Sequence, residues 1–490
     1  MTSPDLPRAI VGSAPPRRPL RVVMFVYNDV SRDSRVLREA ASLVAAGHSV
    51  TIMGRPHNID DRTVSREERD GFTIIRVPIP HEWRTWWFRY RKPWRMRKLI
   101  WRRFLFNLRR GPSGWPRAIA LVGAAIVMVA ASLIRSPFIA ISGGPRQTKH
   151  DSTLDWLTRW RFGVLGWAKA AAAAAPKADV YHGHDLTALP GAVHASKRNG
   201  GLVVYDSHES FLDAGTTSTR PWWGRAILGR YERKIASQAA ALVTVNQSIG
   251  ALLGSRFGLS RVVVVYNTPA RWEPTAAPPD LLCRAAELPP ETPIALYHGA
   301  FSAYRGLEEL ADALLVPGME AVHAVYLGYG SREAALRELA EDPHYGGRLH
   351  VLKAVPPEVL PAWVASADVG VMAIQASTLN HRLSSPNKLF ESIATGLPVV
   401  VSDFVEMRRI VLEDPDGPLG AVCDPADPAS IAAAIRSILD LGPIERADLR
   451  ARCLRAAHER WNWETESAKL VALYASLADE LAAAATLAPG

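Results

Sequence analysis

Short apolar runs rich in β-branched residues alternate along the chain with stretches of helical periodicity. Residues 20–27 form an uninterrupted apolar run, which is typical of a strand buried on both faces. Residues 31–47 repeat apolar positions at helical spacing and end in glycine, and residues 48–54 give a second strand run. The chain therefore opens on a parallel β-α-β unit.

The alternation stops near residue 80 and resumes near residue 178. The further strand runs fall on both sides of a proline-rich link at residues 268–280. Before the link they are residues 178–185, 202–209, 240–246 and 262–267, and after it residues 293–299, 321–328, 349–354, 369–374, 397–402 and 420–424. Two series of this kind predict an α/β protein with two Rossmann-like, doubly wound parallel sheets that face a cleft.

This organisation divides the chain into parts with different expected roles. We predict a flexible N-terminus at 1–19, an N-terminal domain at 20–275 with an insert at 81–175, a C-terminal domain at 276–460, and a helix at 461–490 that packs back on the N-terminal domain. Polar residues follow five of the apolar runs in the N-terminal domain. They are Asn28, His184–Asp185, His208–Glu209, Asn246 and Asn267. Ligands bind at such strand exits in parallel sheets, although about half of these residues are expected as helix caps or turn residues.

The positive charge of the chain is concentrated in the insert. The net charge is +10, and residues 81–117 hold twelve Arg or Lys against one acid, Glu82, with six of the fifteen tryptophans. Residues 118–134 follow as an uncharged, mostly apolar run, shorter than the roughly 20 residues that a spanning helix needs. Because the strands on both sides of the insert belong to one predicted sheet, the chain must emerge on the side it entered. We therefore predict a re-entrant or interfacial segment on an anionic membrane surface.

Two other interpretations of the insert are open. It can be a buried core helix beside a solvated basic loop. It can also bind nucleic acid, although an uncharged apolar run would not contact a phosphate backbone favourably. Three scattered cysteines and the lack of an apolar leader indicate a reducing compartment, so the cytoplasmic side of the cell membrane is expected.

Eight motifs in order carry a family resemblance. They are residues 28–50, 178–192, 203–209, 231–249, 298–314, 327–330, 360–373 and 384–403. Together they resemble the retaining glycosyltransferases of family 4, which have the GT-B fold, over most of the chain except 1–19 and about 80–175. The resemblance implies an enzyme of hexosyltransferase type that uses a nucleotide diphosphate sugar as donor. A UDP-sugar is expected ahead of a GDP-sugar.

The chemistry of such a transfer explains the cations of the second domain. A departing diphosphate accumulates negative charge, which fixed cations and a helix N-terminus stabilise. Arg305 precedes Gly306, where the backbone can pass close to a ligand. Lys388 follows Ser385 and Pro386, which we expect as N-cap and first-turn residue of a helix.

The resemblance implies further roles. Arg305 occupies the position of the family's phosphate-binding lysine, Glu391 that of the glutamate that holds the donor ribose, and Val355 lies near the base. The expected catalytic residues are His208, Arg305 and Lys388, with His208 facing the reacting sugar or, alternatively, structural. The expected donor-binding residues are Gly299, Arg305, Gly328, Gly330, Val355, Asn387, Lys388 and Glu391. The expected acceptor-side residues are Asn28, Asp33, Arg35, His184 and Glu209. The favoured mechanism needs no protein nucleophile.

Two departures from the family pattern concern the donor sugar. Leu383 occupies the position of the first acid in the family's E-x7-E motif. Ala300 occupies the position of the arginine that often follows the strand-end glycine. Asn387 or Asn380 is a candidate for the missing role. Asp414-Pro415-Asp416 imitates a metal motif but sits in a predicted turn, so no metal and no cofactor besides the nucleotide sugar are expected.

The predicted function is transfer of a sugar to a lipid-linked glycan or glycolipid in cell-surface polysaccharide synthesis. Two alternatives remain at this point. A nucleotide-sugar epimerase shares the two-sheet architecture but needs no membrane segment. A non-catalytic membrane scaffold would explain Leu383 and Ala300 but not the retained Arg305, Lys388 and Glu391.

Overall fold

The computed structural model describes most of the chain outside the insert. The described residues are 18–31, 33–58, 61–80, 107, 115–116, 153–273 and 280–487. The chain divides into two compact units, one formed by Met1–Pro78 with Ala168–Gly490 and the other by Ile79–Trp167. The predicted basic and apolar segments at 81–134 lie almost wholly outside the described residues. The second unit ends at Trp167, whereas the predicted insert extends to residue 175.

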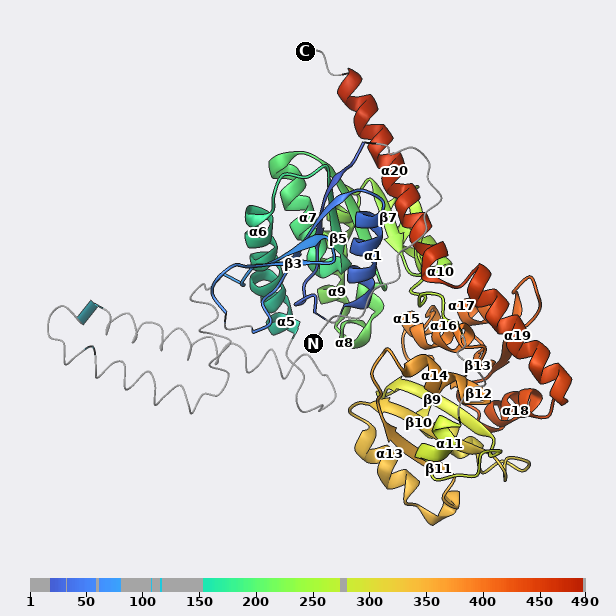
Figure 1. Cartoon of the computed structure of the whole chain (residues 1–490). Helices are drawn as coiled ribbons and strands as arrows, with labels where there is room; N and C mark the ends of the chain where they lie inside the picture. The colour runs from blue at the N-terminus through green and yellow to red at the C-terminus, as the bar shows by residue number, and fades with distance from the viewer. Residues whose placement is uncertain are drawn as a thin grey trace. The chain divides into compact units, whose positions relative to one another are not determined.

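The first unit contains two parallel sheets, each in its own lobe (Figure 1). The first lobe has an eight-stranded sheet in the order β3-β4-β2-β1-β5-β6-β7-β8. Its strands are β1 (Arg21–Phe25), β2 (Ser49–Gly54), β3 (Ser65–Arg69), β4 (Phe72–Arg76), β5 (Val180–His184), β6 (Leu202–Ser207), β7 (Ala241–Thr244) and β8 (Val262–Val264). All neighbours pair in parallel except β3 and β4, so the predicted parallel sheet is confirmed.

The β3–β4 hairpin was not predicted. It lies at one edge of the sheet, and the exposed strand β3 has the sequence SREER, which carries no apolar signal. Asp70 and Gly71 make the turn, with φ of 48° and 81°. Two left-handed residues in a two-residue loop fit the twist of a hairpin, and Asp-Gly is a frequent sequence for it. That dipeptide was the signal available in the sequence.

Helices connect and cover the strands of the first lobe. They are α1 (Ser34–Ala45), α6 (Leu165–Ala174), α7 (Asp185–Asn199), α8 (Gly215–Ser218), α9 (Trp222–Ala236) and α10 (Gln247–Phe257); α5 (Thr153–Arg159) belongs to the other unit. Asp33 caps α1, because its carboxylate accepts a hydrogen bond from the backbone N–H of Val36. Asn246 caps α10 through the N–H of Ile249. Of the polar strand-exit residues, Asn246 therefore also serves as a helix cap through its side chain.

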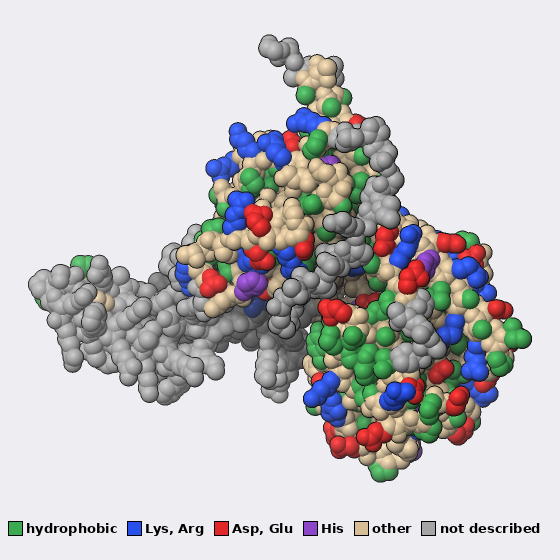
Figure 2. Space-filling view, in the orientation of Figure 1, with side chains coloured by type: hydrophobic (Ala, Val, Ile, Leu, Met, Phe, Trp, Pro, Cys, Tyr) green, Lys and Arg blue, Asp and Glu red, His purple; other side chains and the backbone are tan. Residues whose placement is uncertain are grey.

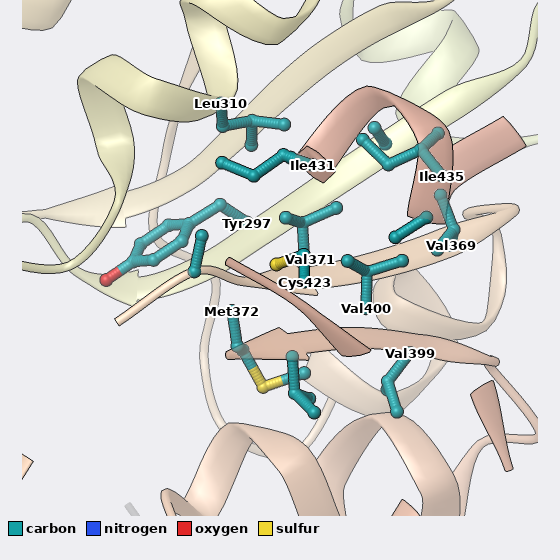
Figure 3. Packing of buried hydrophobic residues seen from close by; sticks show 14 of the residues in the cluster. Tyr297, Leu310, Val369, Val371, Met372, Val399, Val400, Cys423, Ile431 and Ile435 are labelled. Atoms are coloured by element: carbon teal, nitrogen blue, oxygen red, sulfur yellow. The ribbon is translucent and has the colours of Figure 1, made fainter. Parts of the chain in front are cut away.

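The second lobe has a six-stranded parallel sheet in the order β11-β10-β9-β12-β13-β14. Its strands are β9 (Ile294–Ala300), β10 (His323–Tyr329), β11 (Leu349–Lys353), β12 (Val369–Met372), β13 (Val399–Ser402) and β14 (Gly420–Cys423). Its helices are α11 (Leu281–Ala285), α12 (Leu307–Ala313), α13 (Glu333–Ala340), α14 (Leu360–Ala365), α15 (Leu379–Arg382), α16 (Asn387–Ala394), α17 (Val405–Leu412), α18 (Pro428–Leu439) and α19 (Pro443–Glu459). Figure 3 shows the core between this sheet and its helices, where Leu310 and Ile431 pack over the valines of β12 and β13.

The last helix, α20 (Trp463–Leu487), returns to the first lobe. Leu470, Tyr474 and Leu477 are buried in one cluster with residues of β1 and α1, and the Trp463 ring N–H donates to the Ser42 hydroxyl at 3.0 Å. Figure 1 shows α20 running beside the first lobe, beyond α19. Packing of the C-terminal helix ties the two lobes together. Among the described residues, no helix is long and apolar enough to cross a membrane.

Candidate functional site

A pocket of about 580 Å³ lies between the two lobes, at the carboxyl ends of their strands. The first lobe contributes Asn28, Asp29, Asp33, Ser34, Arg35, His208, Glu209, Ala214, Gly215, Val245, Asn246, Ile249 and Asn267, and the second lobe Arg305, Thr378, Asn380, His381, Ser384, Ser385 and Asn387. Seven predicted site residues therefore line this pocket, five from the first lobe and two from the second. They are Asn28, Asp33, Arg35, His208, Glu209, Arg305 and Asn387. The other predicted residues, His184, Gly299, Gly328, Gly330, Val355, Lys388 and Glu391, do not line this pocket.

A strained turn after β9 brings Arg305 to the pocket. Tyr304 and Gly306 have φ of 66° and 74°, in the left-handed region. A Cβ at Gly306 would collide with the carbonyl oxygen of Ala373, so only glycine fits there. The Arg305 Nε donates to the Ser302 hydroxyl at 3.4 Å. The guanidinium is thus presented at the end of β9, where the sequence predicted a phosphate-binding cation.

Lys388 lies in the first turn of α16, directly after Asn387, which lines the pocket. Its ammonium sits 3.6 Å from the centre of the Tyr297 ring. Burial and the charge of Arg305 lower the pKa of Lys388 to about 7. Within the part of the chain that the structure describes, neither cation forms an ion pair, although the charge of Glu391 acts to raise the pKa of Lys388. Two neighbouring cations of this kind form a site suited to an anion.

The predicted start of this helix was wrong by one residue. α16 begins at Asn387, and Pro386 rather than Ser385 precedes it, with no side-chain cap. The Ser385 hydroxyl instead accepts a hydrogen bond from the Asn246 amide of the first lobe at 3.2 Å. The first backbone N–H groups of α16 therefore have no side-chain acceptor from the cap position, which leaves them available to a ligand.

Glu391 follows on the next turn of α16 and contacts His298. The His298 Nε2 lies 2.9 Å from the Glu391 carboxylate. Burial alone would raise the pKa of Glu391, but the hydrogen bond with His298 and the charges of Lys388 and Arg38 lower it overall. The sequence predicted Glu391 but missed His298, which stands directly before the strand-end glycine of β9. A fixed, ionised carboxylate is suited to accept hydrogen bonds from two vicinal hydroxyls.

The glycines of the donor side are required by chain packing. A Cβ at Gly328 would collide with the carbonyl oxygen of Gly299, and one at Gly330 would meet the backbone of Phe301. Gly299 itself has φ of 105°. The ends of β9 and β10 approach each other too closely for any side chain. These positions are explained without a ligand, and their contact with a nucleotide stays a prediction.

On the first lobe, Asp206 at the end of β6 is the centre of a buried ionic network. Its carboxylate pairs with the Arg35 guanidinium at 3.1 Å and with the His184 Nδ1 at 3.1 Å. Arg35 also pairs with Glu39 at 2.9 Å, one helical turn later in α1. All of these side chains are at most 4% exposed. The sequence predicted Arg35 and His184 but missed Asp206 and Glu39, although Glu39 has the i, i+4 spacing from Arg35 that an ion pair on a helix requires.

His208 is held between two carboxylates. Its Nε2 lies 3.1 Å from Asp206 and its Nδ1 3.3 Å from Asp185. Burial alone would lower the pKa of His208, but the charges of Asp185 and Asp206 raise it well above its ordinary value. Both ring nitrogens therefore carry protons, and His208 is an imidazolium at neutral pH. Because both nitrogens are engaged, a hydrogen bond from the ring to a donor hydroxyl requires that one of these contacts be given up.

Glu209 follows His208 and faces the pocket. Burial and the nearby charge of Asp185 raise the pKa of Glu209 to about 7. The Asn380 amide of the second lobe approaches its carboxylate at 3.4 Å. A carboxyl group that changes charge near neutral pH, beside the Asp33 and Asn28 side chains of the same wall, is suited to bind a hydroxylic acceptor.

Among the described residues, one group has donor atoms placed to hold a metal ion. It comprises Glu39, His182, His184 and Asp206, with all ligand atoms within 4.8 Å of one another. The Arg35 guanidinium already pairs with both carboxylates and supplies the compensating charge. The group therefore fits a self-sufficient ionic network better than a metal site. Asp414 and Asp416 lie in a turn after α17 and pair with Arg460, as expected for a loop rather than a metal motif.

Two family models match the chain. The model described as Glycosyltransferase Family 4 covers residues 127–268, and the model described as Glycosyl transferases group 1 covers residues 292–440. The first match lies in the part of the first lobe that follows β4, and the second lies within the second lobe. The chain belongs to glycosyltransferase family 4.

Curated relatives of this family-4 chain include two D-inositol 3-phosphate glycosyltransferases. The one from Geodermatophilus obscurus is 30% identical over 239 residues, 48% of this chain and 45% of that protein. The one from Xylanimonas cellulosilytica is 33% identical over 193 residues, 38% of this chain and 43% of that protein. The chain thus spans less than half the length of these relatives. A glycogen synthase from Mycobacterium tuberculosis is 25% identical over 309 residues, 60% of this chain and 68% of that protein.

Solved structures share the fold of this family-4 chain. Sucrose-phosphate synthase from Thermosynechococcus elongatus aligns with a TM-score of 0.64 at 16% identity, covering 93% of this chain and 98% of that one. A trehalose-6-phosphate structure from E. coli bound with UDP-2-fluoro glucose gives 0.62 at 13% identity, covering 94% and 99%. The two-lobed GT-B architecture is therefore shown.

The structure also shows what occupies the positions where this family-4 chain departs from the common pattern. The Leu383 carbonyl accepts a hydrogen bond from the Asn246 amide at 2.8 Å, and the Ala300 carbonyl accepts one from the Tyr297 hydroxyl at 2.8 Å. Asn387 accepts a hydrogen bond from Asn267 at 2.9 Å, and the Asn380 amide is used by the backbone of Ser210 and by the Glu209 carboxylate. Asn380 is therefore not available to a donor sugar, whereas Asn387 keeps its amide N–H groups.

Proposed function

We propose that this chain transfers a hexose from a nucleotide diphosphate sugar to an acceptor hydroxyl with retention of anomeric configuration. The observation that carries the proposal is that Arg305 lines the interlobe pocket while Lys388, in the first turn of α16, lies close enough for the charge of Arg305 to lower its pKa. The residues 276–460 would bind the donor, with Glu391 accepting from the ribose hydroxyls. The residues 20–275 would bind the acceptor. UDP is proposed ahead of GDP as the nucleotide.

The charge distribution suits departure of a diphosphate. In the reaction the bond between the anomeric carbon and the phosphate oxygen breaks, and a bond to the acceptor oxygen forms on the same face. The acceptor proton moves to the departing phosphate oxygen, so no protein nucleophile takes part. Arg305, Lys388 and the first N–H groups of α16 stabilise the charge that accumulates on the phosphate. A metal ion is not part of this proposal, so activity should withstand a chelator.

The first lobe presents the acceptor. His208, held by Asp185 and Asp206, supplies a fixed positive charge beside the reacting centre. Glu209 and Asp33 supply carboxylates that accept hydrogen bonds from hydroxyls. The names of the relatives include acceptors as different as an inositol phosphate and glycogen, so family membership leaves the acceptor open.

For the acceptor, we propose a lipid-linked glycan or glycolipid, met at the cytoplasmic face of the cell membrane during polysaccharide assembly. The support is the sequence of residues 81–134, where a strongly basic, tryptophan-rich stretch precedes an uncharged apolar run. Deletion of residues 83–141 should reduce membrane sedimentation and abolish transfer to a lipid-linked acceptor. If both remain as in the intact protein, the proposed acceptor class is wrong.

A donor-binding panel tests the proposed activity. The melting temperature of the wild type should rise with one of UDP-, GDP- and ADP-sugars, and Arg305→Ala should remove most of that rise. Arg337→Ala is the matched control, because Arg337 pairs with Glu333 on the exposed surface of α13. No response to any nucleotide sugar would support the scaffold alternative. Conversion of a UDP-sugar to its epimer without acceptor would support the epimerase.

A further inference from the structure

The exposed face of α9 carries an unusual set of apolar side chains. Trp222 is 80% exposed, Trp223 36% and Ile227 52%, and all three lie in the first two turns of the helix. We call these three residues the aromatic end of α9. Two tryptophans and an isoleucine that remain exposed together make a patch that water solvates poorly, which marks an interaction site.

The same helix face becomes basic toward its C-terminus. Arg230, Arg233 and Lys234 are exposed there, and we call them the basic end of α9. At 100° per residue, the aromatic and basic ends fall within roughly 140° of the helix circumference. The opposite face is buried against the first lobe, through Gly224, Leu228, Glu232, Ile235 and Ala236.

The charge of this face has one sign. The single acid in α9 is Glu232, which is fully buried and accepts a hydrogen bond from the Tyr205 hydroxyl at 3.1 Å. The exposed face therefore combines tryptophan with cations and carries no acid. Tryptophan favours the headgroup region of a bilayer, and each Lys or Arg near an anionic surface contributes about 1 kcal/mol. In Figure 2, by contrast, basic and acidic side chains are interspersed over the visible face of the second lobe.

We propose that the exposed face of α9 docks on an anionic lipid bilayer. The aromatic end enters the headgroup region, and the basic end meets the lipid phosphates. From Trp222 to Arg230 the helix rises by about 12 Å, which exceeds the roughly 5–8 Å that the headgroup region of one leaflet adds to the hydrocarbon core. The helix therefore enters obliquely, with its N-terminus deepest.

The position of α9 in the fold gives this contact a consequence. Ala214 and Gly215 line the interlobe pocket and lie in the short stretch that leads to Trp222. Docking through α9 holds the acceptor wall of the pocket near the membrane surface. The contact does not depend on which reaction the pocket catalyses, and it differs from the contact proposed for residues 81–134.

A site-specific label separates the two contacts. The three native cysteines are buried, so a cysteine introduced at an exposed position of the full chain can be labelled selectively. Ile227→Cys is the test position. Ile444→Cys is the control, since Ile444 is 79% exposed on α19 in the second lobe. Both would carry a polarity-sensitive fluorophore and be titrated with vesicles of phosphatidylcholine, with or without phosphatidylserine.

The label at position 227 should shift to the blue with phosphatidylserine vesicles and stay unchanged with phosphatidylcholine alone. The label at position 444 should not respond to either. Arg233→Gln with Lys234→Gln should weaken vesicle binding roughly thirtyfold, which corresponds to the loss of about 2 kcal/mol. An unchanged label at 227 on protein that sediments with the vesicles would overturn the proposal, because membrane binding would then lie elsewhere. A response of equal size at 444 would overturn it as well.

Discussion

The side-chain amide of Asn380 makes two hydrogen bonds to the backbone of Ser210 across the interlobe pocket. The Ser210 N–H donates to its oxygen at 2.9 Å, and its nitrogen donates to the Ser210 carbonyl at 3.0 Å. Ser210 follows the His208–Glu209 pair directly. A residue of the donor lobe therefore fixes the loop that presents the acceptor-side groups, which couples closure of the lobes to the geometry of the site.

Asn380→Ala should impair transfer without abolishing folding. The substitution leaves the buried Ser210 N–H without its acceptor, which costs about 1–3 kcal/mol, whereas the Ser210 carbonyl keeps the hydrogen bond from the Asp213 N–H at 2.9 Å. We expect kcat/KM for the acceptor to fall at least roughly tenfold, with a smaller change in donor affinity. Steady-state kinetics with each substrate varied in turn gives the comparison. Asn199→Ala, which removes a single hydrogen bond to Tyr181 far from the pocket, is the control. Equal losses for donor and acceptor would contradict the positioning role.

Lys388 should make donor binding depend on pH. Its pKa is lowered to about 7, so the free protein loses this positive charge as pH rises through that value. Affinity for a nucleotide diphosphate should therefore be highest below pH 7 and fall above it, and binding at pH 8 should take up a proton because the anion raises the pKa again. Calorimetry in buffers of different ionisation enthalpy measures that proton. Lys388→Arg should bind without proton uptake, and uptake that persists in this variant would assign it to another group.

His208 should stabilise the fold in a pH-dependent way. The carboxylates of Asp185 and Asp206 raise its pKa above the unfolded value of about 6.5. For a raised histidine pKa, the stabilisation is fully present below the unfolded pKa and is lost as pH rises through the folded pKa. The difference in unfolding free energy between wild type and His208→Gln should thus be largest near pH 6 and shrink in alkaline solution. Urea denaturation over this range checks it, and a difference that grows with pH would rule out the imidazolium.

Glu209 should control how the acceptor binds near neutral pH. Its pKa is raised to about 7, so the carboxylate that accepts hydrogen bonds from an acceptor hydroxyl forms as pH rises through that value. The acceptor KM of the wild type should therefore decrease between about pH 6 and pH 8. In Glu209→Gln it should be higher and nearly independent of pH. The same pH profile in both proteins would show that Glu209 does not contact the acceptor.

The sequence by itself determined the two parallel sheets and pointed to the residues that we propose for the donor side. Runs such as LRVVMFVY are buried on both faces of a sheet, and burial of that kind leaves a pattern along the chain that needs no knowledge of partners. Arg305 and Glu391 were found because they belong to short segments whose order matches a family. The β3–β4 hairpin was not predicted, because an exposed edge strand such as β3 needs few apolar residues and leaves no apolar pattern in the sequence.

Only the tertiary structure decided how the first-lobe residues act. Asp206 and Glu39 are ordinary acids in sequence, and they become the partners of Arg35 and His208 because β6 and α1 meet at the strand ends. The engagement of both His208 nitrogens and the use of Asn380 by Ser210 follow from contacts over long sequence separations. Such pairs form only when folding brings distant residues together. Burial and the neighbouring charges then raise or lower the pKa of each group, and neither can be known from the sequence.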